Sequence, residues 1–160
     1  MKIIIALDSF KGTLTALEAC RITAEAIRPV VGDIEIVTMP MADGGEGTAG
    51  AMIAARKGQW ITRQVAGPLV GMKVAAGFGW FEDDCSAIVE MASASGLELL
   101  KADERNPLKT STYGTGELIA EAIKLNCKRL LLAVGGSATV VLEETDEYVV
   151  ARNWNGIVTK

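Results

Sequence analysis

Short apolar runs and helix-spaced apolar stripes follow one another through the first third of the chain. Ile3 to Leu7 is a continuous apolar run ended by Asp8, the pattern of a strand buried on both faces of a parallel sheet. Thr15 and Glu18 form a capping-box sequence before an apolar stripe, which predicts a helix over 14–29. The same reasoning expects a strand at 33–39 and a helix at 48–57. This order is typical of an α/β protein with a doubly wound, largely parallel sheet.

The pattern changes in the middle of the chain, where strand-like runs follow one another directly. These runs lie at 60–65, 73–80 and 86–91, separated by Gly67-Pro68 and by the acidic turn at 82–84. We expect an inserted region of mixed or antiparallel strands there. A helix opening near Gly114 and a buried strand at 129–134 then resume the α/β alternation.

These elements predict four parts in the chain. The expected parts are a first α/β unit at 1–58, a strand-rich insert at 59–105, a resumed α/β unit at 106–139 and a divergent tail at 140–160.

Composition excludes several classes of function. The net charge is −4, so the chain lacks the basic field that attracts nucleic acid or anionic lipid, and neither is an expected partner. The chain contains no histidine, which excludes Ser-His-Asp triads and most zinc sites. The initial apolar run of five residues is too short for a signal peptide or a membrane span, and we expect a cytoplasmic protein.

Four polar, glycine-rich loops follow predicted strands or open predicted helices. In open α/β sheets, ligands bind beyond the carboxyl ends of the strands, where such loops gather. The four loops are Asp8 to Gly12, Asp43 to Gly47, Tyr113 to Glu117 and Gly135 to Thr139.

The first loop offers a carboxylate and an ammonium group. Asp8 could align a substrate hydroxyl or a cation, and Lys11 could neutralise phosphate charge. The alternative is that Asp8 and Ser9 cap a turn while Lys11 is solvated.

The second loop places two carboxylates among three glycines. Asp43 and Glu46 suit metal coordination or proton abstraction from a hydroxyl, and the glycines let a ligand approach the backbone. The alternative is a tight turn followed by an acidic first helical turn.

The two later loops are candidates for anion binding. Gly114-Thr-Gly116 precedes a helix and could present backbone N–H groups, although Thr115 could equally be a plain N-cap. Gly135 to Thr139 follows a buried strand and is a stronger phosphate-loop candidate. It is not a Walker A sequence, because no Gly-Lys-Ser/Thr follows.

Six motifs occur in the order that is typical of the bacterial glycerate kinase family, which the chain resembles over residues 1–139. They are Asp8-Ser-Phe-Lys-Gly12, Pro40-Met-Ala-Asp-Gly-Gly-Glu-Gly47, Glu90-Met-Ala-Ser-Ala-Ser-Gly96, Asn106-Pro-Leu108, Thr112-Tyr-Gly-Thr-Gly-Glu-Leu118 and Gly135-Gly-Ser-Ala-Thr139. The resemblance implies a two-domain α/β fold with a cleft, of which only the N-terminal part is expected here. It implies transfer of the ATP γ-phosphate to a hydroxyl of D-glycerate with Mg²⁺, leaving open which hydroxyl reacts.

The resemblance also implies roles for individual residues. The expected catalytic residues are Asp8, Lys11 and Asp43, with Asp43 also a candidate Mg²⁺ ligand. The expected substrate contacts are Ser9, Glu46, Ser93, Ser95 and Thr115. The expected phosphate contacts are Gly44, Gly45, Gly114, Gly116, Gly135, Gly136 and Ser137.

The chain departs from the family pattern in two places. Leu7 stands where the family commonly has proline, and after Thr139 the family's Asn-Asp-Gly-Gly-type loop is replaced by an unrelated acidic tail. We therefore expect a truncated glycerate kinase whose tail arose from a frameshift, a truncation or a recombination. The alternative is an inactive ligand-binding or interaction domain, and exposed strand edges would favour a homo-oligomer.

Overall fold

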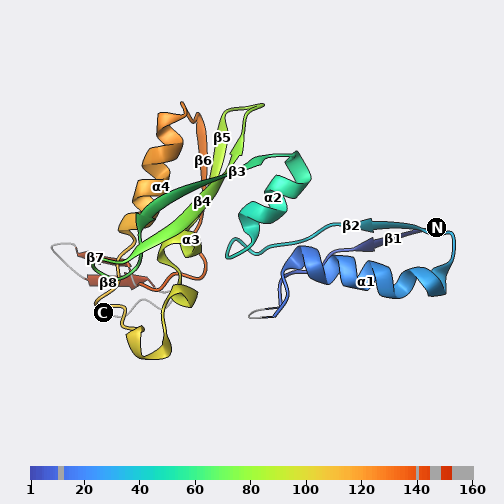
Figure 1. Cartoon of the computed structure of the whole chain (residues 1–160), viewed down its shortest axis with the longest axis horizontal. Helices are drawn as coiled ribbons and strands as arrows, with labels where there is room; N and C mark the ends of the chain where they lie inside the picture. The colour runs from blue at the N-terminus through green and yellow to red at the C-terminus, as the bar shows by residue number, and fades with distance from the viewer. Residues whose placement is uncertain (11–12, 140, 145–148, 153–160) are drawn as a thin grey trace.

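The computed structural model describes residues 1–10, 13–139, 141–144 and 149–152, and Figure 1 shows the arrangement of its elements. The strands are β1 (Lys2–Ile5), β2 (Glu35–Thr38), β3 (Gln59–Ala66), β4 (Lys73–Phe81), β5 (Ser86–Glu90), β6 (Arg129–Ala133), β7 (Val141–Glu144) and β8 (Val149–Arg152). The helices are α1 (Ala16–Val31), α2 (Thr48–Arg56), α3 (Met91–Ser95) and α4 (Tyr113–Lys124), with 3₁₀ turns at Leu97–Leu99 and Ala102–Glu104. The α/β class and the mixed-strand region are confirmed. The short helix α3 and the 3₁₀ turns were not predicted.

The N-terminal unit is a parallel pair of strands covered by one long helix. Lys2–Ile5 pairs in register with Glu35–Thr38, and α1 packs against the pair through a small core of Ile5, Cys20 and Ala24. The capping box at Thr15 and Glu18 is present, as predicted.

Two local expectations for this unit are corrected. Helix α1 continues through Pro29 to Val31, because a proline in the last turn removes only one hydrogen bond there. Strand β1 is covered on one face only, and Ile4 on the other face is 58% exposed, because α1 is the helix that packs on this pair among the described residues.

The second unit is a four-stranded mixed sheet with strand order β3-β4-β5-β6. The pairs β3-β4 and β4-β5 are antiparallel, while β5-β6 is parallel and connected through α3 and α4. Figure 1 shows α4 on one side of this sheet and α2 on the other. The main core lies under α4, where Leu118 meets Phe78 and Val89, and a smaller core of Ala49, Phe81 and Ile88 lies under α2.

Strand β6 is one edge of this sheet within the described part of the chain, and β3 is the other. Its three consecutive leucines, Leu130, Leu131 and Leu132, are between 37% and 43% exposed. In the tail, β7 and β8 form an antiparallel pair. The four-part division of the chain stays a prediction. None of the helices that the structure describes is long and apolar enough to cross a bilayer.

Candidate functional site

Two of the predicted glycine loops meet at the carboxyl end of β6. The N–H of Gly135 donates a hydrogen bond of 3.4 Å to the carbonyl oxygen of Gly44. Gly45 is buried, and a Cβ at that position would lie 3.6 Å from the Cα of Gly135. These glycines therefore lie where the two loops contact each other, and a Cβ at Gly45 would be held in ordinary contact with Gly135 and 3.1 Å from Oδ1 of Asp43.

The Gly135 loop is also bonded to the segment that follows β5. Leu97 N–H donates to the carbonyl oxygen of Gly136 at 2.9 Å, and Ala138 N–H donates to that of Ser95 at 2.8 Å. The side chain of Ser95 is fully buried and its Oγ lies 2.8 Å from Oγ1 of Thr115 on α4. The structure thus brings four predicted loops or motifs into one connected hydrogen-bonded region.

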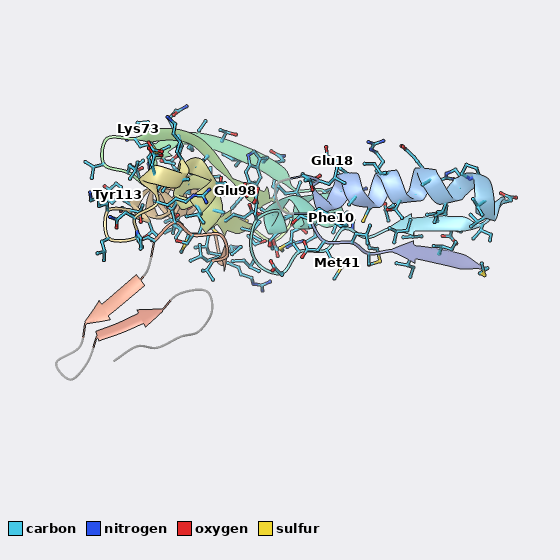
Figure 2. All side chains as sticks on the ribbon, turned by 90° about the horizontal axis from the view of Figure 1, so that it is seen from below. Phe10, Glu18, Met41, Lys73, Glu98 and Tyr113 are labelled. Carbon is cyan, nitrogen blue, oxygen red and sulfur yellow. The ribbon has the colours of Figure 1, made fainter. Side chains whose placement is uncertain are left out.

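A cavity of about 540 Å³ lies between the N-terminal unit and α2. Among the predicted site residues, Ser9 and Glu46 line it. Figure 2 shows Phe10, Met41 and Glu98, three further lining residues, gathered around this junction. The floor is formed by the small residues Gly47, Gly50, Ala51 and Ala54. The space is largely apolar with carboxylates at its margin, a combination that suits a small polar ligand with an apolar portion.

The predicted catalytic carboxylates are exposed and engaged in local turns. The N–H of Ser9 donates to Oδ1 of Asp8 at 2.6 Å, and the N–H of Gly45 donates to Oδ1 of Asp43 at 3.1 Å. These bonds agree with the turn-capping alternative for both residues, and each leaves a second carboxylate oxygen for a ligand. Lys11 lies outside the described residues.

Several other predicted site residues have structural contacts instead. Oγ of Ser93 accepts a hydrogen bond from the N–H of Gly77, and Oγ of Ser137 accepts one from the N–H of Thr139. Gly114 is buried, and a Cβ there would overlap the carbonyl oxygen of Ala66. The helix begins at Tyr113 with Thr112 as the N-cap, so the alternative that Thr115 is an N-cap is wrong.

The structure offers few protein ligands for the expected Mg²⁺ ion. Within the described ranges, no group of three or more acidic or cysteine side chains is arranged to hold a metal ion. Asp43 is exposed, and Mg²⁺ in phosphotransfer sites is commonly held by one or two carboxylates together with substrate phosphates. The donor set is therefore compatible with Mg²⁺ delivered with a nucleotide rather than with a resident metal cage.

Two acidic residues of this region were not among the predicted site residues. Glu98 lines the cavity, and nothing in its local sequence indicates this. Glu90 ends the fully buried strand β5 directly after the apolar run Ala87–Val89, is 7% exposed, and accepts a hydrogen bond from the N–H of Ala49. A charged residue directly ending such a run is a signal that could have identified Glu90. Burial raises the pKa of Glu90, and hydrogen bonds from the backbone of Ala49 and Gly47 oppose this rise.

Comparisons of the sequence and of the structure with known proteins both find glycerate kinases. The model of the glycerate kinase family matches residues 3–140. Glycerate kinases of Haemophilus influenzae and Bacillus subtilis are each 48% identical over 139 residues, and glycerate 2-kinase of Escherichia coli is 47% identical over the same length. These matches cover 87% of this chain but 36% of each relative.

A solved structure shares the fold. The crystal structure of the protein described as glycerate kinase 2 of Salmonella typhimurium LT2 superposes with a TM-score of 0.71 at 39% identity. The superposition covers 95% of this chain and 44% of the other. The chain thus spans about a third to under half of the length of the proteins it matches.

Proposed function

Because the chain belongs to the glycerate kinase family, we propose that it carries part of a site that transfers the ATP γ-phosphate to a hydroxyl of D-glycerate. The observation that supports this most is the shared cavity. Ser9 of the first loop and Glu46 of the second line one space, although 37 sequence positions separate them (46 − 9). D-glycerate is small and carries a carboxylate and two hydroxyls, so a serine hydroxyl is a suitable partner for it.

The residues suggest a division of roles. Asp43, with Mg²⁺ bound to ATP, would hold the phosphates near the glycine loops, and the cation would neutralise charge developing on the transferred group. Asp8 or Asp43 would orient the attacking hydroxyl, and Lys11 would face the phosphate charge. Gly136, exposed and with a φ of 74°, leaves its backbone accessible to a phosphate oxygen.

The direct test is release of ADP by the 160-residue chain with Mg-ATP, with and without D-glycerate. We expect D-glycerate to raise the rate, and Asp43→Asn to lower that increment about tenfold or more, because the carboxylate charge that would hold Mg²⁺ or orient the hydroxyl is lost. Asparagine keeps the oxygen that accepts the Gly45 N–H, so the turn survives and the charge alone is removed. Asp103→Asn, on an exposed 3₁₀ turn, is the matched control.

A folded chain that shows no D-glycerate-dependent ADP release would contradict the proposed activity. If calorimetry still detected D-glycerate binding in that sample, the chain would be an inactive ligand-binding domain of the family. The cytoplasmic location stays a prediction.

Strand β6 favours a second candidate, association between two copies of the chain. Among the described strands its outer edge has no partner, and this edge with its exposed leucines allows the same edge of a second copy to pair with it, burying apolar surface on both sides. We expect light scattering to report a mass that rises with concentration, and Leu131→Lys to abolish the rise. Leu108→Lys, in a loop and 82% exposed in the parent chain, should have no effect. A concentration-independent monomer would exclude this candidate.

A further inference from the structure

Helix α2 lies along one face of strand β5, and three alternate residues of that strand contact it in turn. Alternate side chains of a strand share a face, so Ser86, Ile88 and Glu90 all point toward α2. Ser86 is reached by Arg56 in the last turn of the helix, and Ile88 packs with Ile53 in its middle. Glu90 lies at the beginning of the helix, where its Oε1 accepts the N–H of Ala49 at 2.5 Å.

Helix α2 lacks a capping side chain of its own. Its N-cap is Gly47, which has a φ of 87° and makes no side-chain cap hydrogen bond. The Glu90 carboxylate takes this place, because its Oε1 accepts the N–H of Ala49, the second residue of the helix. A negative charge at the N-terminus of a helix is favoured by the helix dipole and satisfies N–H groups that have no partner inside the helix.

The position of this carboxyl group explains why an acidic side chain is buried here without a cationic partner. Glu90 is 7% exposed, and no lysine or arginine pairs with it among the residues that the structure describes. Its hydrogen-bond partner is the backbone N–H of Ala49, two residues beyond the end of the second predicted loop. Glu46, which lines the cavity, directly precedes Gly47.

We propose that Glu90 is a positioning residue that holds the Asp43–Gly47 loop and the first turn of α2 at the cavity through the backbone N–H of Ala49. It does not need to touch a ligand. Glu90 fixes the C-terminal end of the loop to the end of β5 through Ala49. The N-terminal part of the loop is fixed separately, through the bond between Gly44 and Gly135. The expected effect of Glu90 on D-glycerate binding rests on the proposed function, whereas its effect on the position of the loop does not.

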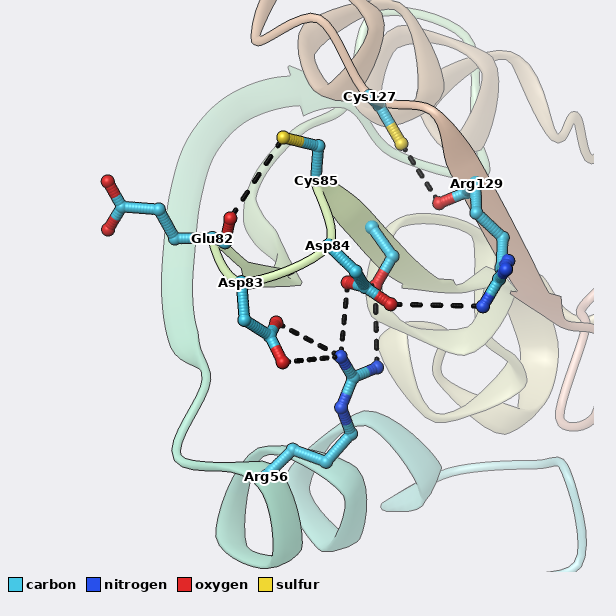
Figure 3. A network of polar contacts seen from close by, with 8 residues as sticks. Arg56, Glu82, Asp83, Asp84, Cys85, Cys127 and Arg129 are labelled. Atoms are coloured by element: carbon cyan, nitrogen blue, oxygen red, sulfur yellow. Dashed lines mark hydrogen bonds and ion pairs between the residues drawn. The ribbon is translucent and has the colours of Figure 1, made fainter.

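The other end of α2 is anchored independently, which makes the effect of Glu90 local. Arg56 donates to both carboxylate oxygens of Asp83 at 3.0 and 3.1 Å and pairs with Asp84 at 3.0 Å, as Figure 3 shows. Its guanidinium also lies 4.3 Å from the centre of the Phe81 ring. With these contacts and the Ile53 packing intact, loss of Glu90 should free the first turn of α2 without detaching the helix.

The test is amide hydrogen exchange on the full 160-residue chain. For Glu90→Ala we expect amides in 44–51 to exchange about tenfold faster, as loss of a cap permits local opening, while amides of β4 and α4 stay unchanged. Glu90→Gln keeps an acceptor at the same reach and should restore most of the protection. Glu90→Asp keeps the charge but is one methylene shorter, and should open the same segment. Glu121→Gln, a carboxylate of α4 that pairs with Arg63 and Lys124 rather than with α2, is the control.

Two results would overturn the proposal: unchanged exchange in 44–51 for both Glu90→Ala and Glu90→Asp, or an increase spread evenly over the chain. Calorimetry with D-glycerate adds a separate readout, in which Glu90→Ala should weaken binding about tenfold and Glu90→Gln should restore it. Absence of binding by the parent chain would contradict the proposed function. The exchange result would still decide whether Glu90 positions the loop.

Discussion

Gly114→Ala is expected to destabilise the fold by about 3 kcal/mol, the upper range for forced overpacking of a core. The new Cβ would overlap the carbonyl oxygen of Ala66 on β3, and a backbone atom in a paired strand has little freedom to move away. Helix α4 would have to shift off the sheet. Urea unfolding followed by tryptophan fluorescence would measure the loss.

Gly116→Ala is the matched control, two residues further along the same helix. A Cβ there meets nothing within 4 Å, so the substitution should stabilise α4 by about 0.5–1 kcal/mol through helix propensity. Equal stability of the Gly114→Ala variant and the parent chain would show that the close contact of α4 with β3 is wrong. The pair also separates two explanations for these glycines, since phosphate binding alone gives no reason for Gly114 to differ from Gly116.

Leu118→Ala is expected to cost about 3 kcal/mol of unfolding free energy, through lost burial and the cavity left behind. Leu118 is fully buried between α4 and the sheet, where it packs in the cluster with Val65, Phe78 and Val89. These neighbours lie on three strands, which limits how far the site can collapse. The midpoint of urea unfolding should fall without a change in slope.

Ile123→Ala provides the comparison on the outer face of the same helix. Ile123 is 62% exposed, and its truncation should change stability by less than about 1 kcal/mol. Similar losses for Leu118→Ala and Ile123→Ala would contradict the orientation of α4 described above. That orientation matters for the site, because α4 also carries Thr115, the partner of Ser95.

Packing and phosphate binding are two separate reasons for glycine in these loops. Gly45 and Gly135 lie where two loops contact each other, and Gly114 allows a helix to approach a strand closely, so Gly114 at least is explained by packing rather than by phosphate binding. Gly136 and Gly116 are exposed and retain the predicted role as candidates. The predicted roles of Asp8, Asp43 and Glu46 stay predictions that the proposed assays address.

The amino-acid sequence by itself determined the features that depend on near neighbours along the chain. The apolar run at Ile3–Leu7 predicted β1, and the Thr15 and Glu18 pair predicted the start of α1, because strand burial patterns and helix caps are set within a few residues. The motif order also indicated the family that the comparisons support. Strands, helix caps and motifs of this kind can be read from residues that lie close together in the sequence.

Only the tertiary structure decided which polar groups act together. Glu90 caps a helix 41 residues away, and the hydroxyls of Ser95 and Thr115 meet across 20 residues. Neither contact leaves a periodic trace, because a single hydrogen bond between distant segments depends on how two elements pack rather than on the residues beside it. The same reason separates Gly114 from Gly116: the motif treats them alike, and only the approach of β3 to one face of α4 distinguishes them.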